Sequence, residues 1–150
     1  MRKFVLSVIL FLCFGSVFFC QTKNNIYVEA LGNGLAYTIN FEREIVQNIN
    51  LRIGYGNILV RTVPIMLNYH YYFENGHSFM AGIGAVNVKW HDDFLSLLDD
   101  FRSDKWTTTL SFAYNVKMKT PGFNIRFAFT PFITSDEFIP YGGVSLGFAF

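Results

Sequence analysis

The chain of 150 residues is poor in charge and has only two cysteines. Charged residues make up 15% of it, against 51% hydrophobic and 19% aromatic residues, which is too little charge to cover the surface of a small soluble domain. Cys13 and Cys20 both stand near the start, so the chain after residue 20 holds no disulfide and no thiolate metal site. The net charge of +1 gives no reason to expect nucleic acid as a partner.

Long apolar runs are also missing after residue 20, so we expect no membrane-spanning helix in that part. The run at 4–20 follows the basic residues Arg2 and Lys3, which is typical of a secretory signal peptide. We therefore predict a signal peptide at 1–20 and a single domain at 21–150. The alternative is an uncleaved anchor, because about 17 apolar residues is the lower limit for a spanning helix.

The rest of the chain alternates between bulky apolar and small or polar residues with a period of two. This pattern predicts an all-β fold, an eight-stranded antiparallel up-and-down transmembrane β-barrel. Gly32-Asn33-Gly34 indicates a tight turn between the first two strands. If that turn were absent, the count would be seven. The expected strands are 24–32, 35–42, 48–56, 62–73, 79–90, 106–118, 123–130 and 141–150.

The composition of the two faces indicates which one is inside. One face is rich in Phe, Leu and Val, and the other carries Thr, Ser, Ala, Gly and Asn with few charges. Small polar residues fit a packed narrow lumen and bulky apolar ones fit lipid. A soluble lipocalin-like barrel, with the bulky face inward, is the alternative. In the fifth expected strand, the apolar residues change from odd to even positions near Gly84, where Val86 and Val88 follow. This change predicts a β-bulge there.

The last ten residues form a strand with one bulky face and an aromatic end. They resemble the C-terminal signal that the barrel-assembly machinery of bacterial outer membranes recognises, so this machinery is an expected partner. The residues that fit the signal are Tyr141, Gly143, Leu146, Phe148 and Phe150.

The lengths of the connections predict the orientation of the barrel. With both termini in the periplasm, the short connections 43–48, 74–76 and 119–122 face inward, and the longest one, 91–105, faces outward. Trp90 and Trp106 bracket this long loop, and we expect them to lie at one level as an aromatic belt.

Charged residues on the small-polar face should be paired, because a dry lumen penalises a lone charge. We expect them to form a salt-bridged plug, with a gated narrow pore as the alternative. They are Glu29, Glu42, Arg52, Lys117 and Arg126.

The long loop carries the remaining candidate chemistry. His91, Asp92, Asp93 and Ser96 are close in sequence, but nothing in their spacing shows the hydrogen-bonded Ser, His and carboxylate that catalysis would need. We therefore predict no enzyme, no cofactor and no metal site. Apolar residues at near-helical spacing in 92–105 indicate either a cap on the barrel rim or a patch for a surface partner.

The whole mature chain resembles the small eight-stranded outer-membrane barrels, the group of the OmpA membrane domain and OmpX. Its opening strand Tyr27-Val28-Glu29-Ala30-x-Gly32 is similar to that of uncharacterised outer-membrane barrels of Gram-negative bacteria. The resemblance implies an outer-membrane location and contact with outer-membrane lipid, and it specifies the architecture rather than an activity. Our favoured hypothesis for the function is a non-enzymatic role in structure or surface contact. The alternatives are a narrow pore and a secreted lipocalin-like carrier of an apolar ligand.

Deletion of residues 148–150 tests the C-terminal signal. The shortened chain should fail to assemble and should be degraded or aggregate in the periplasm, because it lacks the aromatic end of the strand. The measurement is the heat-dependent gel shift of the barrel in membrane fractions. A normal heat-modifiable barrel from the deletion variant would show that residues 148–150 are not needed for sorting.

Overall fold

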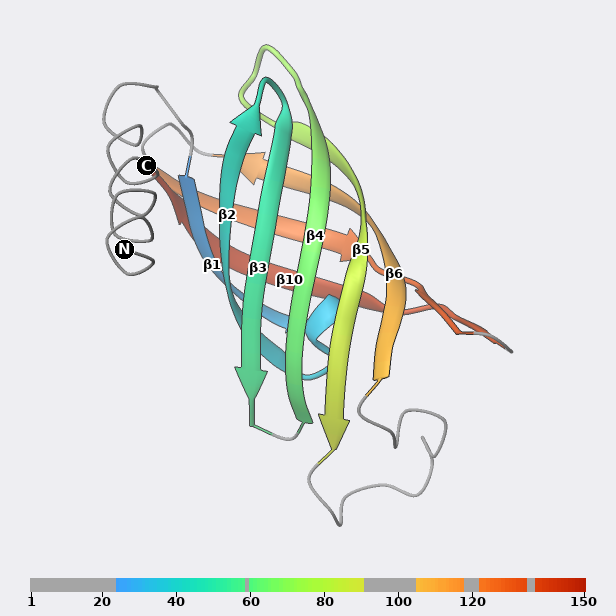
Figure 1. Cartoon of the computed structure of the whole chain (residues 1–150). Coiled ribbons are helices and arrows are strands. Elements are labelled where there is room, and N and C mark those ends of the chain that lie inside the picture. The colour runs from blue at the N-terminus through green and yellow to red at the C-terminus, as the bar shows by residue number, and fades with distance from the viewer. Residues whose placement is uncertain (1–23, 59, 91–104, 118–121, 135–136) are drawn as a thin grey trace, which may run out of the picture.

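The computed structural model describes residues 24–58, 60–90, 105–117, 122–134 and 137–150, with the backbone alone for Trp90, Lys105 and Lys117. Eight long antiparallel strands form a closed barrel (Figure 1). Within the described residues, no helix is long and apolar enough to cross a membrane. The barrel strands are β1 (Asn24–Leu31), β2 (Tyr37–Val46), β3 (Ile49–Asn57), β4 (Val60–Tyr72), β5 (Ser78–Trp90), β6 (Lys105–Lys117), β7 (Gly122–Phe129) and β10 (Gly142–Ala149).

The barrel closes in chain order. The strand order is β5-β4-β3-β2-β1-β10-β7-β6, and β6 returns to pair with β5. Strand β1 pairs with β2 on one side and with β10 on the other, so the first two strands are separate and the expected count of eight is confirmed. The short 3-10 turn η2 (Gly32–Gly34) connects them.

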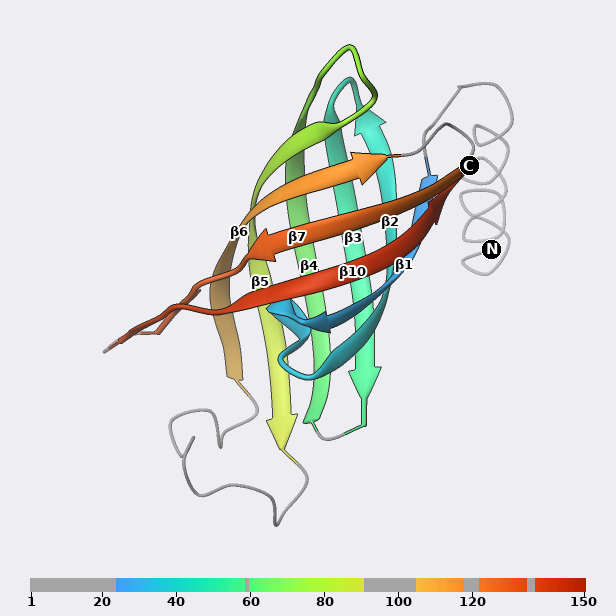
Figure 2. The ribbon, with the colours of Figure 1, turned by 180° about the vertical axis from the view of Figure 1, so that it is seen from behind.

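The two ends of the barrel differ in their connections. At the terminal end, Asn24 and Phe150 exchange backbone hydrogen bonds of 2.8 and 2.9 Å, and the turns at Gln47–Asn48 and 73–77 lie at the same end (Figure 1). The far end carries η2, the β3–β4 connection and a two-stranded hairpin. This hairpin, β8 (Phe132–Ile133) and β9 (Phe138–Ile139), projects from the barrel beyond β7 and β10 (Figure 2).

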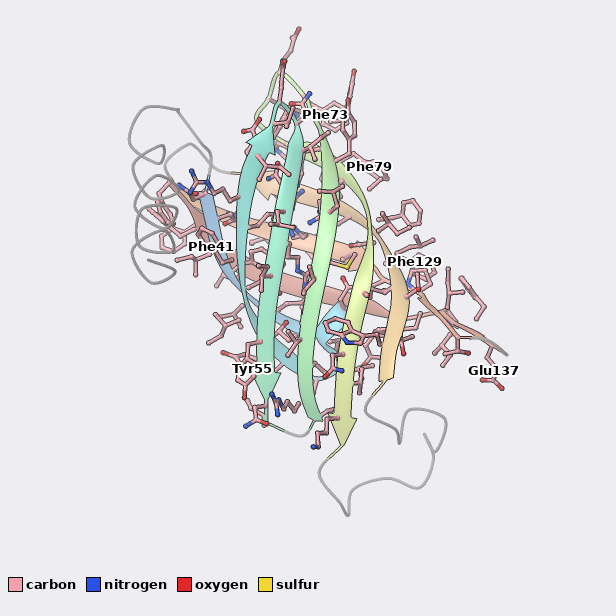
Figure 3. The ribbon with its side chains drawn as sticks, viewed as in Figure 1. Phe41, Tyr55, Phe73, Phe79, Phe129 and Glu137 are labelled. Atoms are coloured by element: carbon pink, nitrogen blue, oxygen red, sulfur yellow. The ribbon has the colours of Figure 1, made fainter. Side chains whose placement is uncertain are left out.

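Burial alternates along each strand as the sequence predicts. In β3, Arg52 and Gly54 are buried whereas Ile53 and Tyr55 are about half exposed, at 49% and 51%. The large apolar side chains stand outward around the barrel, among them the labelled Phe41, Tyr55, Phe79 and Phe129 (Figure 3). Small and polar residues fill the inside, which is opposite to the arrangement expected for a lipocalin-like barrel.

Aromatic residues mark both edges of the outward face. Near the terminal end, Tyr71, Phe79 and Tyr114 form one cross-strand row on β4, β5 and β6. Near the far end, Trp106 is 57% exposed and aligns with Asn87. Phe79 and Asn87 are eight positions apart on β5. At about 3.3 Å per residue and a tilt of about 40°, the rows are roughly 20 Å apart.

The predicted bulge near Gly84 is wrong. Strand β5 pairs continuously with β4 through Trp90 and with β6 through Val88. Val86 and Val88 are 0% and 1% exposed, because they point into the lumen, whose far end is apolar. The inward positions of β5 therefore change from small or polar to apolar residues, while the strand itself continues without a bulge. Leu35, expected on the outward face, is also buried in this apolar part.

The level shared by the two tryptophans stays a prediction, because the side chain of Trp90 lies outside the described residues. Trp106 aligns with Asn87, whereas Trp90 pairs with Val60, three positions further along β5.

An arginine in place of Ile83 tests the lipid-facing assignment. Ile83 is 57% exposed and lies midway between the two aromatic rows, so Ile83→Arg should destabilise a membrane-embedded barrel by about 2–4 kcal/mol. Ile58→Arg, near the far rim, is the control and should cost about 0–1 kcal/mol. The measurement is urea unfolding in phospholipid vesicles, and equal costs at both positions would contradict the assignment.

Candidate functional site: the closed lumen

Two ion pairs occupy the middle of the lumen. Arg52 on β3 pairs with Glu29 on β1. Arg126 on β7 pairs with Glu42 on β2, with 2.6 Å between Arg126 Nη2 and Glu42 Oε2. All four side chains are at most 2% exposed. Each buried charge therefore has a partner of opposite sign, which such an environment requires.

The ring of Tyr27 contacts both arginines. The guanidinium carbon of Arg126 is 4.5 Å from the ring centroid, and that of Arg52 is 5.3 Å away. Arg126 Nη1 also donates a hydrogen bond of 2.8 Å to the Tyr27 hydroxyl. The negative face of an aromatic ring attracts cations, so Tyr27 stabilises two like charges that would otherwise repel across a narrow space.

Amide side chains complete the hydrogen bonding of Arg52. Its Nε donates to Asn40 Oδ1 at 3.0 Å and its Nη1 donates to Asn33 Oδ1 at 3.1 Å. Asn40 fits because its neighbour on β3 is Gly54, where an added Cβ would lie 2.1 Å from the Asn40 oxygen. Glycine at this position therefore makes room for the arginine's partner.

The carboxylate of Glu42 has three polar partners. Besides Arg126, Asn68 Nδ2 donates to Glu42 Oε1 at 2.9 Å, and His70 Nε2 lies 2.9 Å from the same oxygen. Gly82 leaves space for Asn68, since a Cβ there would lie 2.1 Å from the Asn68 amide oxygen. His70 and Asn68 were not predicted as parts of the charge network. Asn68 and His70 follow Met66 by two and four positions on the small-polar face of β4, and this position was the signal that could have identified them.

The turn η2 folds into the lumen and closes its far side. Asn33 is fully buried and donates from Nδ2 to Thr109 Oγ1 on β6 at 2.7 Å. Thr62 on β4 donates to the Gly34 carbonyl at 3.2 Å. Leu35 has a φ of 63°, and Tyr141 donates to its carbonyl oxygen at 2.5 Å. Contacts from three parts of the chain therefore hold this strained turn in place.

An apolar layer lies beyond the ion pairs at the far end. Phe132 of β8 is fully buried against this layer, and the phenol ring of Tyr141 is tilted onto it with centroids 5.9 Å apart. Burial raises the pKa of the Tyr141 phenol. The layer excludes water from the plug and was not predicted, since its valines look like lipid-facing residues in the sequence. Its buried members are Leu35, Val60, Val86, Val88 and Phe132.

A small polar cavity of about 40 Å³ opens at the terminal end. Asn24, Asn50, Ser78 and Asn124 contribute to its wall, which reaches inward to His70, Glu42 and Arg126. The Asn50 amide oxygen has no hydrogen-bond partner within the described residues. A cavity of this size and polarity can hold one or a few water molecules.

Other predicted residues lie at the edges of this arrangement. The Lys117 backbone pairs with Asn124, and its side chain, like that of Trp90, lies outside the described residues. His91, Asp92, Asp93, Ser96 and the segment 92–104 also lie outside them. In the described part of the chain, no group of three or more His, Cys, Asp or Glu side chains could hold a metal ion.

The C-terminal residues lie on or next to β10. Leu146, Phe148 and Phe150 are 58%, 42% and 50% exposed on the outward face. Phe148 packs edge-on against Phe123 of β7, with centroids 5.4 Å apart. Gly143 faces inward, where a Cβ would lie 2.6 Å from the Gly32 nitrogen, so glycine is needed for η2 to enter the lumen.

Comparisons with known proteins identify the same fold. No protein-family model matches the chain, and no curated protein matches its sequence. Among solved structures, the N-terminal β-barrel domain of Pseudomonas aeruginosa OprF has a TM-score of 0.60 at 11% identity, with 86% of this chain and 96% of that chain covered. The chain thus has the fold of the small eight-stranded barrels.

Two further structures share it. The Yersinia pestis outer membrane protein Ail, in a phospholipid bilayer nanodisc, has a TM-score of 0.56 at 10% identity. The match covers 87% of this chain and 100% of the Ail chain. The designed protein TMB2.3 has a TM-score of 0.56 at 12% identity, with coverages of 84% and 92%.

The pairing pattern gives a specific test. Arg126→Met leaves Glu42 buried without its guanidinium and should lower the free energy of unfolding by about 3–5 kcal/mol. Adding Glu42→Gln should recover part of the loss, because the amide carries no charge. Adding Glu29→Gln should not, since Glu29 pairs with Arg52. Urea unfolding of the four proteins in detergent measures this, and equal recovery by both second changes would contradict the pairing.

Proposed function

We propose that the chain is an outer-membrane β-barrel with a closed lumen and a non-enzymatic role in envelope structure or surface contact. One observation carries the proposal. The exterior is apolar around the barrel, while paired charges and amides fill the middle of the interior, an arrangement that supports a closed barrel in a membrane.

The outward face supports a membrane location. Leu67, Ile83 and Leu146 are 46%, 57% and 58% exposed, an arrangement that water would disfavour and lipid favours. The aromatic rows, roughly 20 Å apart, fit the apolar band of about 25 Å of outer-membrane barrels. OprF and Ail, which share the fold, support the outer membrane as the location.

The connections support the proposed orientation. The terminal end, with the chain ends and short turns, would face the periplasm, and the far end would face the outside. The strand β10, with its outward Leu146 and Phe148, would be the part that the assembly machinery binds. A contact with a surface partner would then fall to the far end, where 92–105 connects β5 to β6.

Membrane fractionation tests the location. The mature chain should be found with the outer membrane and should shift in gel mobility on heating, as closed barrels do. Recovery of the folded chain in the soluble fraction would overturn the proposal.

A narrow pore is the second candidate, and the polar cavity at the terminal end favours it. The wall of this cavity reaches Glu42 and Arg126, and beyond these stand the second ion pair, η2 and the apolar layer. An eight-stranded lumen is only wide enough for side chains. The filled interior therefore argues for a barrel that is wet at one end and closed at the other.

Planar-bilayer recordings separate the two candidates. Purified wild-type protein should give no steady, large single-channel conductance, because side chains block the lumen at two levels. The control is the same sample after heat unfolding, which reveals any conductance from contaminants. A steady channel that disappears on unfolding would favour the pore.

A further inference from the structure

Two basic side chains stand side by side at the far end of the outward face. Arg61 on β4 and Lys89 on β5 are direct register partners, and both are exposed. Asn57 on β3 is the partner of Arg61 on its other side. Directly opposed residues of antiparallel strands have Cβ atoms about 5 Å apart, and like charges there are destabilising. A bound anion would remove this repulsion.

The described carboxylates do not neutralise the pair. Neither Arg61 nor Lys89 forms an ion pair within the described residues. In the adjacent outward row, their neighbours are Val63, Asn87 and Trp106, none of them acidic. The described carboxylates are two in the lumen, two near the terminal end and one at the start of β9: Glu29, Glu42, Glu44, Glu74 and Glu137.

The position of the pair along the barrel indicates where such an anion would come from. The Arg61–Lys89 row is the next outward row beyond that of Trp106, on the far side from the terminal end. On the membrane location proposed above, on which this step rests, the Trp106 row lies at the interface. The basic row then lies at the level of the lipid headgroups, toward which long cationic side chains extend.

We propose that Arg61 and Lys89 together bind the anionic phosphate of a lipid headgroup in the outer leaflet. The planar guanidinium of Arg61 can bond two phosphate oxygens at once, and the ammonium of Lys89 acts as a compact charge beside it. A phosphate between them replaces a repulsive pair by two attractive contacts. The exposed Asn57 lies beside Arg61 in the register and can contact the remaining headgroup oxygens.

Native mass spectrometry of the purified barrel tests the site, with monophosphoryl lipid A as the probe and phosphatidylcholine as the neutral reference. Each of Arg61→Gln and Lys89→Gln should weaken binding of the probe about fivefold, and the two together more, with phosphatidylcholine binding unchanged. Arg43→Gln is the matched control, since Arg43 lies near the terminal end, and it should leave probe binding unchanged. Arg61→Lys keeps the charge and should retain most of the affinity.

Unchanged probe binding in the double variant would overturn the site, and so would an equal loss in Arg43→Gln. Displacement of the probe by inorganic phosphate at equal concentration would overturn the assignment to a lipid headgroup. If the double variant does not fold, the single variants test the site, and unchanged probe binding in both of them would overturn it. The proposed membrane location is tested separately, and it would be wrong if the folded wild-type protein were recovered in the soluble fraction. The lipid site fails when the barrel folds and shifts on heating but its affinity for the probe does not depend on Arg61 and Lys89.

Discussion

The neutralisation of buried charge in the lumen depends on closure of the barrel. Glu42 on β2 and Arg126 on β7 are separated in the sheet by β1 and β10, so they come together only across the lumen of a closed barrel. Tyr27 on β1 contacts the same arginine from the other side of the β1–β10 seam. On the proposed membrane location, an open sheet would expose both charges to lipid without partners, which is costly. The charge pairs therefore favour the closed form and the observed register.

The lumen is sealed by different interactions along its length. At the terminal end, amide side chains line a cavity large enough for water. In the middle, charges pair with each other and with Tyr27. At the far end, η2 and an apolar layer exclude water, and this part includes Leu31 and Leu35 with positive φ angles of 62° and 63°. Such backbone conformations cost about 1–3 kcal/mol each, so the bonds from Thr62 and Tyr141 to the turn and its following residue offset a real strain.

The sequence was enough to predict the barrel, the strand count and the facing of most strands. Bulky apolar residues alternate with small or polar ones wherever the outward face is apolar and the inward face packs polar side chains. The prediction failed at Leu35, Val86 and Val88, since an apolar side chain does not show whether its apolar surroundings are lipid or a buried cluster. The hairpin β8–β9 was missed because two-residue strands are too short to show a period. Pro131 and Pro140, which flank it, were the available signal.

The pairing within the lumen could not be predicted from register alone. Glu42 is the direct cross-strand partner of Arg52, yet Arg52 pairs with Glu29 and Glu42 with Arg126. The hydrogen bonds of Arg52 to Asn33 and Asn40 orient its guanidinium, and Asn33 reaches it only because η2 folds inward. The inward fold of η2 thus supports the Arg52–Glu29 pair.

The same constraints limit where the chain can recognise other molecules. On the proposed membrane location, the outward rows have to be apolar to lie in the bilayer, and the lumen side chains are engaged with one another. Polar variation is tolerated at the rims, where neither constraint applies. At the terminal rim, a basic and an acidic residue follow each other at Arg43 and Glu44, whereas the Arg61–Lys89 row at the far rim carries charge of one sign. A surface with one sign of charge beside the Trp106 row is suited to an anionic headgroup, so the proposed lipid site lies at an edge that the stability of the barrel leaves free.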